Sequence, residues 1–149
     1  MKKLNYSIII NAPKEIVWNT MLEDKTYRLW TEVFSKGSHY VGNWQKGNKI
    51  LFLGPDENGN LGGMVSRIKE NRLYEYISIE HIGLIMNGKE DLESEEVKKW
   101  AGAFENYTLQ EKDGKTEVLI DLDMNEDHIE MFNNLWPKAL QKLKELAEQ

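Results

Sequence analysis

The strand pattern around His81 places an imidazole, which titrates near neutral pH, on the inward face of an expected β-strand. In residues 72–82, Ile77 and Ile79 alternate with more polar neighbours, and Glu75 and His81 share their parity. Successive side chains of a strand point to opposite faces, so residues of one parity lie together. We therefore expect Glu75 and His81 to face the interior. A histidine in that position can act as a general acid or base.

A carboxylate on a second expected strand has the same kind of placement. Glu105 shares its parity with Tyr107 and Leu109. Because an ionised carboxylate in an apolar interior needs a partner or a raised pKa, Glu105 requires a donor. His81 is the first candidate for that donor, and Tyr40 and Tyr107 are alternatives. His81 and Glu105 are thus the catalytic candidates of the chain, and a bulge or strand end at either would instead leave that side chain in water.

Several large side chains could line an apolar ligand pocket. Such pockets are mostly apolar and aromatic, with a few polar groups. The same side chains could equally fill the core, because aromatic residues dominate core burial. The candidate ligand-binding residues are Trp30, Phe34, Tyr40, Trp44, Ile77, Tyr107, Phe132 and Trp136.

Other site chemistry is not indicated. The chain has no cysteine, which excludes thiolate nucleophiles, thiolate metal sites and disulfides. Asp56-x-Asn58-x-Asn60 begins like a calcium loop, but Leu61 and Arg67 occupy the positions that require Gly and Glu. The three histidines lack zinc-motif spacing, and no Gly-x-Ser-x-Gly sequence is present. We expect no metal site and no cofactor.

The charge and length of the chain restrict its partners. The 149 residues include 19 Lys and Arg against 25 Asp and Glu, a net charge of −6, which argues against binding nucleic acid. No segment approaches the roughly 20 apolar residues of a membrane span, and the run at residues 8–10 is too short for a secretory signal. We expect a single cytoplasmic domain over residues 1–149.

The elements that must position these residues follow from periodicity and turn signals. Residues 83–99, which carry an acidic stretch, are expected to form a solvated connection with one helical turn. The final helix is expected to begin at the cap Asn125 and to be kinked by Pro137. Strands are expected at 3–11, 38–44, 49–53, 62–70, 72–82, 100–111 and 116–123, short helices from Pro13 and over 25–31, and a long helix over 125–149.

This order predicts an α+β fold in which a curved antiparallel sheet of about seven strands is covered by the C-terminal helix. An antiparallel sheet needs one face covered. Only the last helix has an apolar stripe long enough for that role. Because a strongly curled sheet cannot contact one straight helix everywhere, a cavity between them is expected.

The order and spacing of several short motifs resemble the START/Bet v 1-like (SRPBCC) superfamily. Within it the chain is most similar to bacterial proteins like the C-terminal domain of the activator of Hsp90 ATPase (AHSA1-like). The resemblance implies a helix-grip fold with a ligand cavity, in a superfamily whose members bind lipids, hormones or polyketides and sometimes catalyse reactions. The motifs are residues 10–18 with Ala12-Pro13, Trp30, Gly42-Asn43-Trp44, Gly62-Gly63, Glu105-Asn106-Tyr107-Thr108 and Trp136-Pro137.

Three functions are compatible with these features. The first is binding of a small hydrophobic or amphipathic molecule in the cavity. The second is an enzyme of the same fold that uses His81 and Glu105. The third is a protein-interaction module of the co-chaperone kind, although nothing in the residues themselves supports a chaperone partner.

Overall fold

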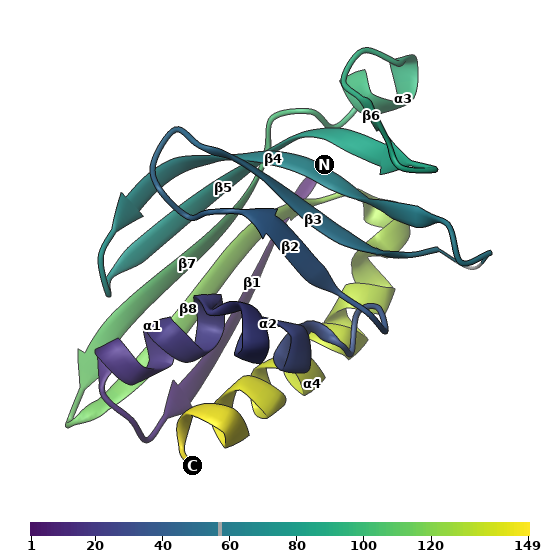
Figure 1. Cartoon of the computed structure of the whole chain (residues 1–149). Coiled ribbons are helices and arrows are strands. Elements are labelled where there is room, and N and C mark those ends of the chain that lie inside the picture. The colour runs from purple at the N-terminus through teal and green to yellow at the C-terminus, as the bar shows by residue number, and fades with distance from the viewer. Residues whose placement is uncertain (57) are drawn as a thin grey trace.

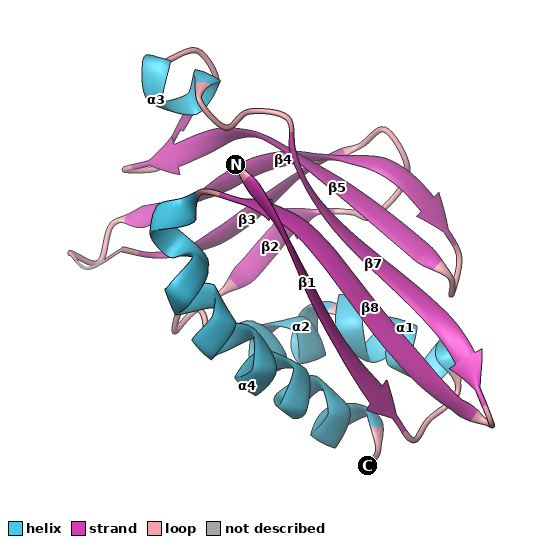
Figure 2. Ribbon diagram, turned by 180° about the vertical axis from the view of Figure 1, so that it is seen from behind, coloured by secondary structure: helices cyan, strands magenta, loops and turns pink. Residues whose placement is uncertain are grey.

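The computed structural model describes residues 1–56 and 58–149, and its strands arch over three helices (Figures 1 and 2). The short helix α3 lies apart from the others, beyond the end of the sheet. The strands are β1 (Lys2–Ile10), β2 (His39–Gly42), β3 (Lys49–Pro55), β4 (Leu61–Arg72), β5 (Tyr76–Met86), β6 (Lys89–Asp91), β7 (Ala103–Lys112) and β8 (Lys115–Met124). The helices are α1 (Lys14–Leu22), α2 (Asp24–Thr31), α3 (Glu95–Lys98), the 3-10 turn η1 (Glu126–His128) and α4 (Ile129–Ala147).

The described strands form one eight-stranded sheet in the order β1-β8-β7-β5-β4-β3-β2, with β6 paired to the far end of β5. All its pairs are antiparallel. The α+β helix-grip class expected from the sequence is therefore confirmed, with one strand more than the seven or so expected.

The additional strand lies in the segment that was expected to be a loop. That expectation for residues 83–99 is wrong in its first half, because β5 continues to Met86 and the chain then returns as β6. The reversal uses Asn87 and Gly88, both with positive φ (52° and 77°). The expected helical turn is present as α3, capped by the Ser94 hydroxyl, which accepts a hydrogen bond from the Val97 amide.

The turn between β4 and β5 corrects the expectation for Glu75. Residues 73–75 form this turn, with Tyr74 at a φ of 65°, so the alternation that begins in β5 does not extend back to Glu75. The Glu75 side chain is exposed and pairs with Lys14 at 3.7 Å. Glu75 does not face the interior.

Two register shifts bend the β4–β5 pair. Val65 pairs with Gly83 and Ser66 with His81, which leaves Ile82 as an extra residue in β5. A second shift leaves Lys69 unpaired in β4. Bulges of this kind increase local twist and bend a strand. They contribute to the curvature that separates part of the sheet from α4.

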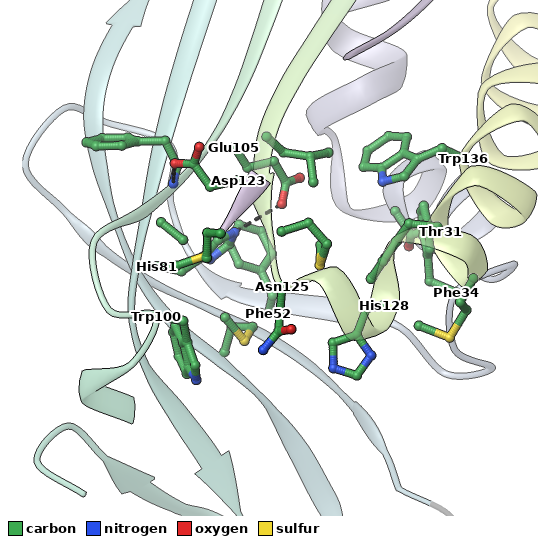
Figure 3. Close-up of a pocket in the computed structure, with 18 of the residues that line it drawn as sticks. Thr31, Phe34, Phe52, His81, Trp100, Glu105, Asp123, Asn125, His128 and Trp136 are labelled. Atoms are coloured by element: carbon green, nitrogen blue, oxygen red, sulfur yellow. Dashed lines mark hydrogen bonds and ion pairs between the residues drawn. The ribbon is translucent and has the colours of Figure 1, made fainter. Parts of the chain in front are cut away.

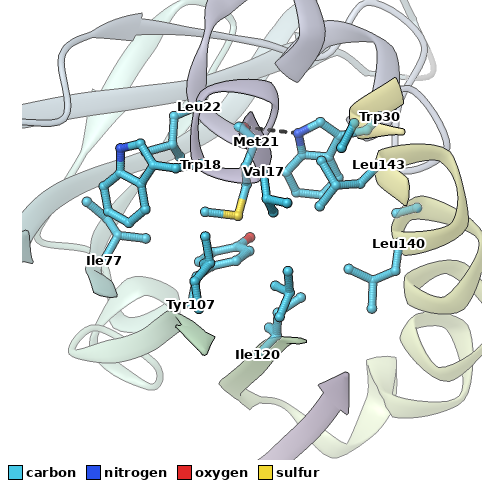
Figure 4. Close-up of a cluster of buried hydrophobic side chains, with 14 of the residues drawn as sticks. Val17, Trp18, Met21, Leu22, Trp30, Ile77, Tyr107, Ile120, Leu140 and Leu143 are labelled. Atoms are coloured by element: carbon cyan, nitrogen blue, oxygen red, sulfur yellow. Dashed lines mark hydrogen bonds between the residues drawn. The ribbon is translucent and has the colours of Figure 1, made fainter. Parts of the chain in front are cut away.

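The packed core occupies the side of the concave face that lies against α1, α2 and the C-terminal half of α4 (Figure 4). Trp30 is only 2% exposed, and its indole N–H donates to the carbonyl of Met21 at 3.0 Å. Leu143 of α4 is completely buried in the same cluster. The core therefore fixes α2 and α4 against the sheet at one end and leaves their other ends to border the site described next.

The start of the C-terminal helix differs slightly from expectation. Asn125 is a cap, as expected, but its side chain accepts a hydrogen bond from the Asp127 amide and begins the turn η1 rather than α4. Pro137 lies inside α4. One turn earlier, the Asn133 side chain accepts a 2.6 Å hydrogen bond from Tyr6 and ties α4 to the edge strand β1.

Candidate ligand-binding cavity

A cavity of about 560 Å³ lies between the concave face of the sheet, the end of α2 and the N-terminal half of α4. Its walls are largely aromatic and aliphatic, with His81 and Glu105 on the sheet side and Asn125 and His128 near the start of α4 (Figure 3). The sheet contributes side chains from β3, β4, β5, β7 and β8. Trp100 from the segment before β7, together with His128 and Met131 at the start of α4, borders the cavity near solvent.

His81 and Glu105 meet on the sheet side of the cavity. The Nε2 atom of His81 lies 3.0 Å from Oε1 of Glu105 (Figure 3). In the β5–β7 pairing Glu105 is opposite Ile79, and His81 is opposite Ala103, so the two residues are diagonal neighbours on one face. Long side chains in such positions are within reach of each other. Both line the cavity.

Two hydroxyl groups extend this pair into a hydrogen-bonded chain. The Tyr107 hydroxyl donates to Oε2 of Glu105. On the other side, the Ser66 hydroxyl lies 2.7 Å from Nδ1 of His81. Ser66 is completely buried behind the imidazole and does not line the cavity. It therefore orients His81 and is not placed to attack a bound molecule.

The surroundings of Glu105 favour its ionised form. Burial alone would raise the pKa of this carboxyl, but hydrogen bonds from His81 and Tyr107 and the charge of His81 outweigh it, so the pKa is lowered. For Tyr107, burial and the neighbouring Glu105 charge raise the pKa well above its ordinary value. Tyr107 is thus a neutral donor to an ionised carboxylate.

The remaining charged side chains of the wall are also acidic. Asp123 accepts a hydrogen bond from the Phe104 amide and pairs with Lys3 at 3.6 Å. Glu96 lies at the exposed side and pairs with Lys99. In the described part of the chain no lysine or arginine lines the cavity.

Trp136 presents an unpartnered donor at the same cavity. Its side chain is 4% exposed, and its Nε1 atom has no hydrogen-bond partner within residues 1–56 and 58–149. Its ring lies 6.2 Å from the ring of Tyr107 and 4.9 Å from that of Phe34. A buried N–H without an acceptor costs free energy, which an acceptor entering the cavity would recover.

The eight residues proposed from the sequence as ligand-binding are divided by the structure. Five of them line the cavity: Trp30, Phe34, Tyr107, Phe132 and Trp136. Ile77 is completely buried in the core. Tyr40 and Trp44 lie outside the lining, because their polar atoms both donate to the carbonyl of Leu22 at 2.6 and 3.1 Å. They thereby satisfy a carbonyl at the end of α1 that has no partner within the helix.

Several residues in the cavity wall or directly behind it were not anticipated. Ser66 shares its parity with Met64 and Ile68, so the alternation of the expected strand 62–70 contained a usable signal. The inward position of Leu84 could not be found from alternation, because the extra residue Ile82 reverses which residues of β5 face inward after it. Three others were expected only at the start of an element, the strand 100–111 or the helix 125–149, and the structure places them outside β7 and α4, in the turns that precede them: Trp100, Asn125 and His128.

Comparison with known proteins gives a clear result for the fold. No protein-family model and no curated protein sequence matches the chain, whereas many solved structures do. A protein from Nitrosomonas europaea, NE0264, matches with a TM-score of 0.73 and 16% identity over 97% of this chain and 92% of that one. The Aha1 dimer from Colwellia psychrerythraea matches with a TM-score of 0.72 and 18% identity, over 99% of this chain and 97% of that one. An AHSA1-like protein from Aeromonas hydrophila matches with a TM-score of 0.70 and 14% identity, over 99% of this chain and 92% of that one.

The chain has an AHSA1-like fold. The resemblance seen in the sequence motifs is confirmed at this level, since the matches extend over nearly the whole length of both partners. No helix of the described residues is long and apolar enough to cross a membrane.

Proposed function

We propose that this AHSA1-like chain binds a small amphipathic molecule in the cavity between the sheet and α4. The observation that carries the proposal is the composition of the cavity wall, which is mostly apolar, with many aromatic side chains, and carries the His81–Glu105–Tyr107 group on one side. Cavities of about 300–1,000 Å³ with apolar walls and a few convergent polar groups are typical of small-molecule sites. The volume of about 560 Å³ falls in this range.

A neutral fluorescent probe tests the proposal directly. N-phenyl-1-naphthylamine should bind with one-to-one stoichiometry and raise the melting temperature, because a ligand that binds only the folded state stabilises it. Trp30, Trp100 and Trp136 line the cavity, so the probe should also quench a large part of the intrinsic tryptophan emission.

A pair of alanine positions provides a matched comparison. Ala103 is buried and lines the cavity, whereas Ala101, two residues earlier, is exposed and outside it. We expect Ala103→Phe to weaken probe binding at least tenfold and Ala101→Phe to bind as the wild type does. If Ala103→Phe does not fold, Leu84→Trp fills the same space from β5. Undiminished binding by a folded, filled variant would contradict the proposal.

Acid–base catalysis in the same cavity is the second candidate function. It is favoured by the contact between His81 and Glu105, whose side chains are still 13% and 25% exposed and line the cavity. An ionised carboxylate and an imidazole in one wall can exchange protons with a bound molecule. Mass spectrometry of ligands recovered after incubation separates the two functions: conversion that is lost in His81→Gln supports catalysis, and uniform recovery of unchanged ligands supports binding alone.

A further inference from the structure

The polar groups of the cavity restrict the chemistry of its ligand, and the argument rests on the proposed binding function. We infer that the site takes a neutral, largely aromatic molecule whose polar end both donates and accepts a hydrogen bond, such as a phenol, an alcohol or a carboxamide. Fatty acids and other carboxylates are selected against.

The acceptor function of the ligand follows from Trp136. Its buried Nε1 has no partner in the described chain, and the indole borders the cavity. In Figure 3 the nitrogen edge of the Trp136 indole faces the space among the lining side chains. An indole N–H only donates, so the group that satisfies it must carry a lone pair. An ammonium group cannot do so.

The donor function of the ligand follows from Glu105. The two oxygens of a carboxylate can accept about four hydrogen bonds, and Glu105 receives one from His81 and one from Tyr107. A quarter of its side-chain surface remains exposed. The ring of Tyr107, whose hydroxyl reaches Glu105, lies 6.2 Å from the Trp136 ring. Glu105 and Trp136 thus border the same cavity, where the polar end of one ligand can meet them.

The exclusion of anions follows from the charges of the wall. Glu105 already engages His81, and no lysine or arginine in the described residues lines the cavity to compensate a second carboxylate beside it. Asp123 and Glu96 are paired with Lys3 and Lys99, so they neither attract nor strongly repel an anion. Bringing a second carboxylate beside Glu105 into an apolar site carries a cost of desolvation and of like-charge repulsion. A neutral hydroxyl avoids both costs.

Four naphthalenes with one shared body test the inference at pH 7. Isothermal titration should rank 2-naphthol tightest, with naphthalene about two- to tenfold weaker for lack of a polar group. 2-Naphthoate should bind at least tenfold more weakly than 2-naphthol, and 2-naphthylmethylammonium should also bind more weakly than 2-naphthol. A preference for the carboxylate or the ammonium compound would overturn the inference.

Two cavity variants and one control assign the effect to residues. Trp136→Phe keeps an aromatic ring without the N–H, so it should reduce the advantage in affinity of 2-naphthol over naphthalene, while the contribution of Glu105 to that advantage remains. Glu105→Gln should reduce the ratio of the affinities for 2-naphthol and 2-naphthoate at least tenfold. Trp18→Phe changes a buried tryptophan outside the cavity. This control should not alter the affinity of 2-naphthol relative to either naphthalene or 2-naphthoate. Equal losses for naphthalene and 2-naphthol in Trp136→Phe would contradict the role of the N–H.

The indole resonance of Trp136 gives an independent readout. In ¹H–¹⁵N spectra, with the peak assigned by its absence in Trp136→Phe, 2-naphthol should move this resonance downfield and naphthalene should not. Equal downfield movement with both compounds, or none with 2-naphthol, would refute the hydrogen bond. Failure of every naphthalene and of N-phenyl-1-naphthylamine to bind would instead refute the proposed function itself, whereas binding without discrimination would refute only the ligand class.

Discussion

The imidazole of His81 holds the carboxylate of Glu105 from the neighbouring strand, with 3.0 Å between Nε2 and Oε1. The contact is diagonal, since Glu105 is paired with Ile79 in the strand register. It forms on a face where the surrounding strand residues are mostly apolar, so its disruption should be measurable in stability as well as in binding.

Glu105→Gln should destabilise the protein by about 1–3 kcal/mol at pH 7, because hydrogen bonds to a charged group are lost. The loss should depend on pH. The folded-state pKa of Glu105 lies below its ordinary value of 4.5, so the stabilisation is present above about pH 4.5 and disappears as the pH falls through the folded pKa. Urea denaturation of both proteins from pH 7 to pH 3 measures it. Glu111→Gln, exposed on the same strand, is the control, and a difference that stays constant down to pH 3 would contradict the assignment.

Ser66 and Glu105 should be energetically coupled through His81. Ser66→Ala removes the 2.7 Å contact with Nδ1 and should cost about 1 kcal/mol. Residues in one hydrogen-bond network typically show coupling energies of about 0.5–3 kcal/mol in a double-mutant cycle. Ser78 donates a hydrogen bond to Asn106 between β5 and β7, the strands of His81 and Glu105, but contacts neither of those two residues. The effects of mutating Ser78 and Glu105 should therefore be additive in a double-mutant cycle. Equal coupling for both serines would show that the cycle reports general loosening of the sheet.

The two halves of α4 should respond differently to truncation of a large side chain. Leu143→Ala should cost about 2–5 kcal/mol, because Leu143 is completely buried in the core. Phe132→Ala should cost only about 1 kcal/mol, since Phe132 is half-buried and borders the cavity. Thermal and urea unfolding compare the two variants. A larger loss for Phe132→Ala would indicate that the N-terminal half of α4 contributes more to the core than its burial suggests.

Gly83 should be intolerant of a side chain. A Cβ atom there would lie 2.6 Å from the carbonyl oxygen of Asp91 and would also meet the Leu92 side chain. Gly83→Ala should therefore cost about 1–3 kcal/mol and loosen the β5–β6 pairing. Gly62→Ala, for which the closest added contact is 3.5 Å, is the matched control. Hydrogen exchange of the β6 amides measures the local effect, and equal protection in both variants would contradict it.

The sequence carried the order of elements and the central contact but not the irregular positions. His81 and Glu105 were found by alternation because Ile77 and Ile79 precede the bulge and Tyr107 lies in an unbroken strand. The same rule failed for Glu75, which lies in a turn, and for Leu84, which follows the extra residue Ile82. A bulge depends on how two strands fit together, and a single-strand pattern does not contain that information.

The sequence also could not show which aromatic side chains line the cavity. Tyr40 and Trp136 are alike in sequence terms, as large residues with one polar atom in amphipathic segments. Only the tertiary arrangement gives Tyr40 a helix-end carbonyl to bond and leaves the N–H of Trp136 without one. Composition and spacing do not distinguish a satisfied donor from an unsatisfied one.

The bulges in β4 and β5 have a consequence for how the site can change over evolutionary time. Because backbone curvature helps to create the space between the sheet and α4, the cavity does not depend only on small residues kept at its wall. Lining positions can be exchanged at a lower cost in folding free energy than positions in the core around Leu143. The residues of the cavity wall can therefore change while the fold persists, in keeping with the 10–18% identity between this chain and structures that match nearly its whole length.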